Sequence, residues 1–192
     1  MNIHNECWLV VCNFIEAGEV DKAIALCESD RCSNSVDCQR YLGWEYYAQG
    51  NMEKSLIWFL KAVDQNDVES LFGAGSVEFC EKNYISAICY FKRAAENGYP
   101  RAYQWIANIY CRTEDFPVNV EEALKYYKKG ASHGFLMSKR AIISIDMKSG
   151  NIFIKLVSAL KLIFLMIEML IISFRDINDI RMSDVPNVFE KK

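Results

Sequence analysis

The chain has 192 residues, enough for one domain with a sizeable hydrophobic core. Apolar residues make up 52% and charged residues 24%, proportions that are typical of a globular protein. The formal net charge is −3, both signs are interspersed, and there is no run of lysine or arginine. The composition therefore argues against nucleic-acid binding.

The amino-terminal stretch, residues 1–13, has no basic residue before its short apolar patch. A secretory signal needs a positively charged start and a longer apolar segment, so we expect no signal peptide and a cytoplasmic location. In that compartment the eight cysteines are expected to be reduced thiols that pack as small hydrophobic residues. A single disulfide, for example Cys32 with Cys38, is the alternative.

Neither metal ligands nor cofactor motifs stand out along the chain. The cysteines include no Cys-x-x-Cys pair, and the two histidines, His4 and His133, are far apart. Gly73-Ala74-Gly75 falls inside an expected helix, where glycine favours close packing and not phosphate binding. We therefore predict no metal site, no cofactor and no catalytic residues. A hydrolase with an unrecognised site is kept as an alternative.

Internal repetition is the strongest signal in the sequence. A shift of 32 residues carries Gly18 onto Gly50 and Gly43 onto Gly75, together with the apolar positions around them. The next repeat keeps this spacing in its first half and lengthens it by four residues in its second half. The extra residues fall at positions 113–119, which contain a proline and are predicted to form a loop.

Each repeat is expected to form two helices, as in residues 38–48 and 52–64. The second helix carries Leu56, Phe59, Leu60 and Val63 on one stripe at helical spacing. Gly98 and Gly134 follow second helices, where a residue with positive φ is favoured. The small residues Gly43 and Gly75 predict close helix–helix contacts. Because one helical pair cannot bury both of its faces, several pairs are expected to stack into a solenoid.

The repeated residues resemble the Sel1-like repeat, a relative of the tetratricopeptide repeat. Leu42-Gly43 with Tyr46 matches the first-helix pattern, and Ile106-Ala107 with Tyr110 nearly matches it. Two second helices match the alanine, aromatic and glycine positions of the family, at Ala87, Tyr90, Phe91, Ala94, Ala95 and Gly98, and at Ala123, Tyr126, Tyr127, Ala131 and Gly134. The resemblance covers roughly residues 1–148, with a degenerate first repeat and Glu78 where the pattern has tyrosine. It implies an all-α, right-handed solenoid of four to five helical pairs in residues 1–150.

The carboxyl-terminal segment, residues 151–174, is expected to form an apolar amphipathic helix. Its five polar residues fall within an arc of about 140° when the sequence is drawn as a helix. Three placements remain open: a cap whose apolar face packs on the last repeat, a helix in a membrane interface or on a partner, and a true membrane span. Lys155, Lys161 and Glu168 argue against the span. Residues 175–192 are predicted to be an irregular tail.

First helices line the concave wall of stacked helical pairs, which is where such proteins usually hold a partner. The residues on this wall that combine aromatic anchors with polar groups are Tyr41, Trp44, Glu45, Trp105, Asn108 and Arg112. Trp, Tyr and Arg often carry interface energy, although each of these side chains could also belong to the core. We expect Trp44 and Trp105 to contact the partner and to tolerate alanine without loss of folding.

The resemblance implies a protein-binding function, as an adaptor, as a regulator, or as an immunity protein that neutralises a cognate bacterial effector. A membrane-associated adaptor anchored by Ile152 to Phe174 is the alternative, which would make the protein peripheral to the membrane. The sequence indicates no oligomeric state.

Overall fold

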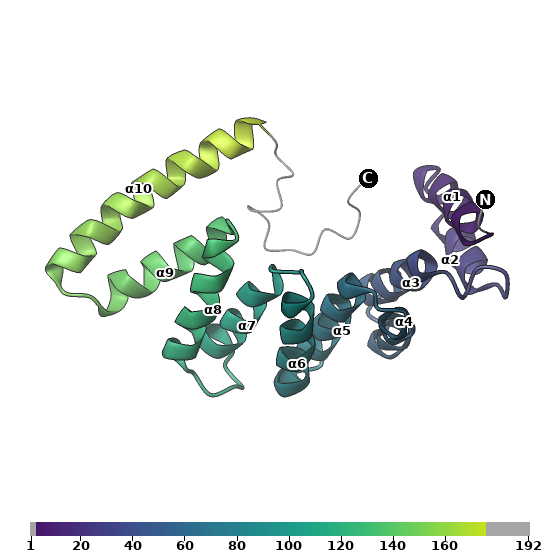
Figure 1. Ribbon diagram of the computed structural model, residues 1–192, viewed down its shortest axis with the longest axis horizontal. Coiled ribbons are helices and arrows are strands. Elements are labelled where there is room, and N and C mark those ends of the chain that lie inside the picture. The colour runs from purple at the N-terminus through teal and green to yellow at the C-terminus, as the bar shows by residue number, and fades with distance from the viewer. Residues whose placement is uncertain (1–2, 176–192) are drawn as a thin grey trace. The chain divides into compact units, whose positions relative to one another are not determined.

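The computed structural model describes residues 3–175. Over this range the chain forms ten α-helices and no strand, which confirms the predicted all-α class. Contacts divide the chain into two compact units, residues 1–99 and residues 100–192. The helices of each unit appear in Figure 1.

Unit 1 contains three helical pairs, and each helix packs on the next. The helices are α1 (Ile3–Glu16), α2 (Val20–Glu28), α3 (Val36–Ala48), α4 (Met52–Asp64), α5 (Val68–Cys80) and α6 (Tyr84–Glu96). Side-chain caps fix where two of them begin: Asn51 accepts a hydrogen bond from the backbone N–H of Lys54 at 3.1 Å, and Asp67 accepts one from Ser70 at 2.8 Å. The predicted second helix, residues 52–64, agrees with α4 at both ends.

The core of unit 1 is organised around Phe59 of α4, whose side chain is completely buried. A Cβ atom added to Gly43 of α3 would lie 2.5 Å from Cδ1 of Phe59, and one added to Gly73 of α5 would lie 2.5 Å from its Cζ. The Ser55 hydroxyl also donates to the carbonyl oxygen of Gly43 at 2.7 Å. Glycine on α3 and α5 therefore makes room for the aromatic ring, which confirms the predicted close helix contacts.

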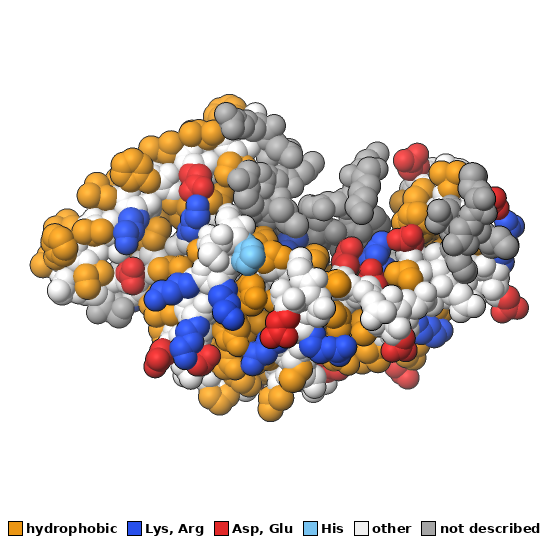
Figure 2. Space-filling view, in the orientation of Figure 1, with side chains coloured by type: hydrophobic (Ala, Val, Ile, Leu, Met, Phe, Trp, Pro, Cys, Tyr) orange, Lys and Arg blue, Asp and Glu red, His pale blue; other side chains and the backbone are white. Residues whose placement is uncertain are grey.

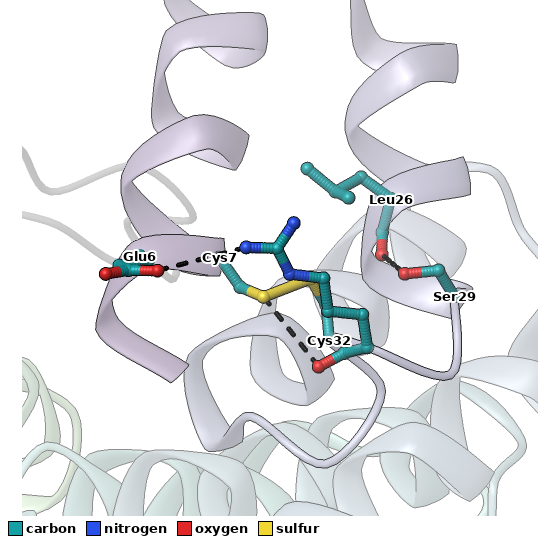
Figure 3. The surroundings of a disulfide bond; sticks show 6 residues. Glu6, Cys7, Leu26, Ser29 and Cys32 are labelled. Carbon is teal, nitrogen blue, oxygen red and sulfur yellow. Dashed lines mark hydrogen bonds and ion pairs between the residues drawn. A yellow bond between two sulfur atoms is a disulfide. The ribbon is translucent and has the colours of Figure 1, made fainter. Parts of the chain in front are cut away.

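A disulfide joins the first helical pair to the loop that follows it (Figure 3). Cys7 of α1 bonds to Cys32, which lies between α2 and α3, and the two Cα atoms are 5.8 Å apart. The prediction that all eight cysteines are reduced is therefore wrong for these two, and Cys38 is not the partner of Cys32. Cys32 meets Cys7 because the loop after α2 turns back onto the start of α1, a return that cysteine spacing does not encode. Cys38 is instead a free thiol buried in the same core cluster.

Unit 2 contains the remaining two pairs within the described residues. Its helices are α7 (Ala102–Arg112), α8 (Val120–Ser132), α9 (Leu136–Ser149) and α10 (Ile152–Arg175). The predicted loop at 113–119 separates α7 from α8. Gly134, with φ of +89°, ends the α8 turn as expected, since this conformation is costly for other residues. Tyr127 of α8 is buried in the core of this unit with Ala107 of α7 and Ala141 of α9.

The apolar helix α10 packs on α9 and so completes a fifth helical pair. Its buried stripe consists of Ser158, Leu165 and Ile172, and Leu136 and Ile143 of α9 pack against the two apolar members. This stripe lies on the arc that carries the polar residues. The expectation that a cap would pack with its wide apolar face is therefore wrong: α10 packs with its narrow side, which gives α9 both an apolar contact through Leu165 and Ile172 and an ion pair through Glu168.

The wide apolar face of α10 remains exposed on the described part of the chain. Figure 2 shows hydrophobic side chains gathered along this helix. Residues 152–174 have a mean hydropathy of 2.3 and the length to cross a membrane, and only 17% of their most apolar window is buried.

Candidate functional site

Two of the predicted partner-binding residues, Tyr41 and Trp44 on α3, lie in the core of unit 1. Trp44 is 3% exposed and packs edge-on against Phe59, with 4.9 Å between ring centroids. Tyr41 is 7% exposed, and its ring contacts that of Trp8 at 6.1 Å. Their burial contradicts the expectation that both project into an open groove. The physical reason is the glycine pair that admits Phe59 into the core, because that ring offers Trp44 an apolar surface to cover.

Two polar features of α3 accompany these rings. Glu45 is half-buried and accepts a hydrogen bond from the Gln49 side chain at 3.3 Å. Burial, followed by the nearby Glu45 carboxylate, raises the pKa of Tyr41 above its ordinary value. Tyr41 thus stays neutral under physiological conditions and acts as a packing residue. Of the three predicted residues on α3, only Glu45 reaches solvent to a useful extent.

In unit 2 the predicted residue Asn108 lines a pocket of about 230 Å³ between the first helices α7 and α9. Trp105, on the same helix, is half-buried, and the side chain of Arg112 lies outside the described residues. The pocket is lined by Gln104, Asn108, Tyr127, Met137, Arg140, Ala141 and Ser144. Four of these seven side chains, excluding the tyrosine, carry amide, guanidinium or hydroxyl groups, so the pocket is mainly polar.

Hydrogen bonds orient the amides that line this pocket, which we call the α7–α9 pocket. The Tyr127 hydroxyl donates to Oδ1 of Asn108 at 2.7 Å, which leaves the amide N–H groups of Asn108 as donors. Ser138, buried beneath the pocket, donates to Oε1 of Gln104 at 3.4 Å. Gly130 of α8 makes room for Ser138, since a Cβ there would lie 2.6 Å from the serine oxygen.

Arg140 and Ser144 are exposed on the α9 side of the pocket. Within residues 3–175 the Arg140 guanidinium makes no ion pair, so its five N–H donors face solvent at the rim. Together with Asn108 they present hydrogen-bond donors and a positive charge. The arrangement suits an acceptor group that carries negative charge or carbonyl oxygens.

The pocket is built from equivalent positions of successive repeats. A step of 36 residues, the one that carries Gly98 onto Gly134, also carries Gln104 onto Arg140 and Asn108 onto Ser144. Asn108 was identified from the sequence, whereas Gln104, Arg140 and Ser144 were missed. The repeat spacing itself was the signal that could have found them, because residues at one repeat position on neighbouring first helices lie side by side.

In unit 1 the same repeat positions are filled. A step of 32 residues carries Arg40 onto Phe72 and Trp44 onto Ser76. The Trp44 and Phe72 rings lie 6.4 Å apart and occupy the space between α3 and α5. Arg40 bonds to Asp67 at 2.8 Å, so its charge is satisfied internally. Unit 1 therefore offers a closed surface at the position where unit 2 has a pocket.

Metal ligands and nucleophiles are the groups on which most hydrolases depend. No three His, Cys, Asp or Glu residues of that part of the chain gather closely enough to hold a metal ion. Burial, with Glu16 as the next cause, raises the pKa of the Cys12 thiol, which disfavours the nucleophilic thiolate.

The stacked helical pairs define an α-solenoid repeat scaffold. The family model of the Sel1 repeat matches residues 36–67, 70–99 and 100–135, which together make up just over half of the chain. The protein belongs to the Sel1 repeat family, as the sequence resemblance predicted. Sel1 repeats generally mediate protein–protein interactions and typically serve as non-catalytic scaffolds.

Solved structures agree on the fold. A Sel1 repeat protein from Oxalobacter formigenes is 21% identical, with a TM-score of 0.58 over 74% of this chain and 62% of that one. The protein c5321, a protective antigen present in uropathogenic Escherichia coli strains that displays an SLR fold, is 20% identical, with a TM-score of 0.64. That alignment covers 78% of this chain and 35% of c5321, so the chain spans only part of either relative. No protein of curated function matches the sequence.

Proposed function

We propose that this protein is a binding module that holds a partner protein on its first helices, with the α7–α9 pocket as the centre of the interface. The observation that carries the proposal is the exposed Arg140, which has no ion pair within residues 3–175, beside the oriented amide of Asn108. Arg40 of α3, at the equivalent position one repeat before Phe72, is by contrast paired internally with Asp67. Donors left facing solvent at a pocket are free to bind a second molecule.

The chemistry of the pocket selects the group that enters it. Arg140 recognises a carboxylate through two parallel N–H···O bonds, and Asn108 and Ser144 supply further donors. We propose that an acidic side chain or a chain-terminal carboxylate of the partner occupies this space. Trp105 and Arg112 of α7 and Glu45 of α3 remain proposed contacts, whereas Tyr41 and Trp44 support the surface from within the core.

We further propose that the protein is a regulator or immunity protein that neutralises a cognate bacterial effector. A general adaptor role is the less specific form of this proposal. The family supports binding but names no partner. Cytoplasmic location belongs to this proposal, and the Cys7–Cys32 disulfide stands against it, because cytosolic thiols are usually kept reduced. Co-purification with the product of a neighbouring reading frame tests the role, and failure of the two proteins to associate contradicts it.

The pocket is tested by charge reversal. The partner is first captured from the native cell by the tagged full-length chain, and its affinity for the purified protein is then measured by calorimetry. Arg140→Glu and Asn108→Ala should each weaken binding by at least about tenfold, the usual size of a lost interface hot spot. Lys128→Glu makes the same charge change on the exposed part of α8 outside the pocket, and it should leave affinity unchanged. Equal affinity for Arg140→Glu and the parent would place the interface elsewhere.

A further inference from the structure

Helix α10 has two faces of different chemistry, and only one of them is covered by the described part of the protein. The outer face spans an arc of about 160° at 100° per residue and contains no polar side chain. Its large side chains are each at least 48% exposed. They are Ile152, Phe153, Leu156, Leu160, Ile163, Phe164, Met166, Ile167, Leu170, Ile171 and Phe174.

The opposite, inner face is held by α9, so the direction of the outer face is fixed within unit 2. Leu165 and Ile172 pack with Leu136 and Ile143 of α9. Lys139 of α9 donates to both carboxylate oxygens of Glu168. The helix cannot turn its outer face inward without giving up this apolar contact and this ion pair.

The charges of the α9–α10 hairpin are complementary to an anionic surface. Residues 136–174 contain five basic and two acidic residues, although the whole chain has a net charge of −3. Lys155 and Lys161 are exposed on α10 and flank the outer face on its two sides. Lysine stems of this kind lie along apolar surface while their ammonium groups reach lipid headgroups.

We propose that α10 lies flat in the interface of an anionic lipid bilayer, with its outer face among the acyl chains and α9 on the water side. A helix of this length is about 36 Å long, so a flat orientation submerges the outer face along its whole length. This orientation keeps Lys155, Lys161 and the Lys139–Glu168 pair at the headgroup level. A perpendicular crossing would place the middle of α10 and its charged residues in hydrocarbon, at roughly 2.5–3.5 kcal/mol for each unpaired charge.

A second copy of the chain fits this surface less well than a bilayer does. One partner helix covers an apolar stripe of roughly 100°, which would leave much of the outer face in water. Close packing of two such helices also favours small residues, whereas Ala159 is the only small residue on this arc and the rest are bulky. Lipid chains adapt to a broad, bulky face without needing complementary grooves.

The test uses the full-length protein and sedimentation with phosphatidylcholine vesicles that contain or lack phosphatidylglycerol. The parent should bind the anionic vesicles, lose affinity in high salt, and be released by alkaline carbonate. Phe164→Glu on the outer face should reduce partitioning at least tenfold, and Lys155→Glu with Lys161→Glu should remove the preference for anionic lipid. Ile85→Glu replaces an equally exposed apolar residue of α6 and should bind like the parent. Circular dichroism of each variant verifies that it remains helical.

Three outcomes would overturn the proposal. Absence of binding to either vesicle would show that the outer face does not meet lipid. Resistance to carbonate extraction would mean that α10 spans the bilayer instead of lying in its surface. Dimerisation that Phe164→Glu abolishes, in a protein that ignores vesicles, would assign the outer face to a second copy. None of these results bears on the α7–α9 pocket, so the partner-binding proposal is tested separately.

Discussion

Lys139 of α9 donates to Oε1 and Oε2 of Glu168 on α10, at 2.8 and 3.0 Å. This ion pair lies between the apolar contacts that Leu165 and Ile172 make with α9, and the three contacts together define the rotation of α10 and its register along α9. The pair contributes orientation more than stability, because both side chains are partly solvated.

The effect of reversing the charge of one member of this pair should be compensated by reversing the other. Lys139→Glu places two carboxylates together and should lower the free energy of unfolding, and adding Glu168→Lys should restore most of the loss. A double-mutant cycle measured by urea unfolding is expected to give a coupling of about 0.2–1 kcal/mol. Additive effects of the two substitutions would mean that the groups do not interact in solution.

Gly75 of α5 should tolerate no larger residue. A Cβ atom there would lie 2.7 Å from Cδ1 of Phe91, a ring that is fully buried and cannot move aside. Gly75→Leu is therefore expected to destabilise unit 1 by roughly 1–3 kcal/mol through overpacking. Ala25→Leu adds similar bulk at an exposed position of α2 and serves as the control in thermal denaturation. An unchanged melting temperature for Gly75→Leu would show that Gly75 does not pack against Phe91.

Trp44→Ala should cost stability, contrary to what its place on a first helix suggests. Removal of this buried ring uncovers Phe59 and leaves a cavity, at roughly 3–5 kcal/mol. Trp58→Ala is a matched comparison, because its half-buried ring lies under the Lys61 ammonium at 3.7 Å on the surface of α4. Denaturant unfolding should show a larger decrease in the free energy of unfolding for Trp44→Ala than for Trp58→Ala. Equal decreases would indicate that Trp44 lies on the surface.

Stability should fall at alkaline pH in a way that depends on Tyr46. Burial, followed by the hydrogen bond that its hydroxyl donates to Glu28, raises the pKa of Tyr46 to about 12. Tyrosine in the unfolded chain titrates near pH ~10. The folded state therefore holds its proton more tightly, and the resulting stability is complete below pH ~10 and is lost as pH rises to about 12.

Tyr46→Phe removes this titration. The difference in unfolding free energy between parent and variant should be constant up to pH ~10 and should shrink between pH ~10 and ~12. A difference that stays level across this interval would show that Tyr46 titrates at its ordinary pKa.

The disulfide should stabilise the first helical pair. It closes a sequence separation of 25 residues between Cys7 and Cys32. A loop of this length corresponds to about 3.5 kcal/mol in the chain-entropy description. Unfolding by urea with and without a reductant should reveal this difference, and Cys7→Ser should remove the effect of the reductant. Cys89→Ser, at an exposed free thiol, should leave it in place.

Much of the fold could be predicted because equivalent positions in each repeat make the same kind of packing contact. The stripe through Phe59 identified the buried side of α4, and Gly43 and Gly75 at the repeat spacing identified positions of close helix contact. The helix-ending glycines and the loop at 113–119 followed from backbone chemistry alone. Local periodicity and glycine placement are read directly from sequence, so these features needed no knowledge of the tertiary structure.

The failures arose where a side chain had two possible neighbours. The sequence pattern predicted that Trp44 faces a groove, but in the structure it packs over Phe59, whose ring fills the space beside Gly43 and Gly73. For α10 the hydrophobic pattern favoured burial of the wide face, whereas the structure buries the narrow side, where Leu165 and Ile172 pack on α9 and Glu168 pairs with Lys139. The Cys7–Cys32 pairing depends on a loop that carries no periodic signal.

The equivalence of Trp44, Ser76, Asn108 and Ser144 along the first helices has a consequence for how such a protein diversifies. One position per repeat decides whether the space between neighbouring first helices is filled by a ring or left open to a ligand. The choice also affects stability, because the Trp44 ring covers Phe59 in the core, whereas Asn108 accepts a hydrogen bond from the buried Tyr127. A single exchange at this position can therefore open or close a recognition site, and a repeat that loses the ring must replace the packing that the ring supplied.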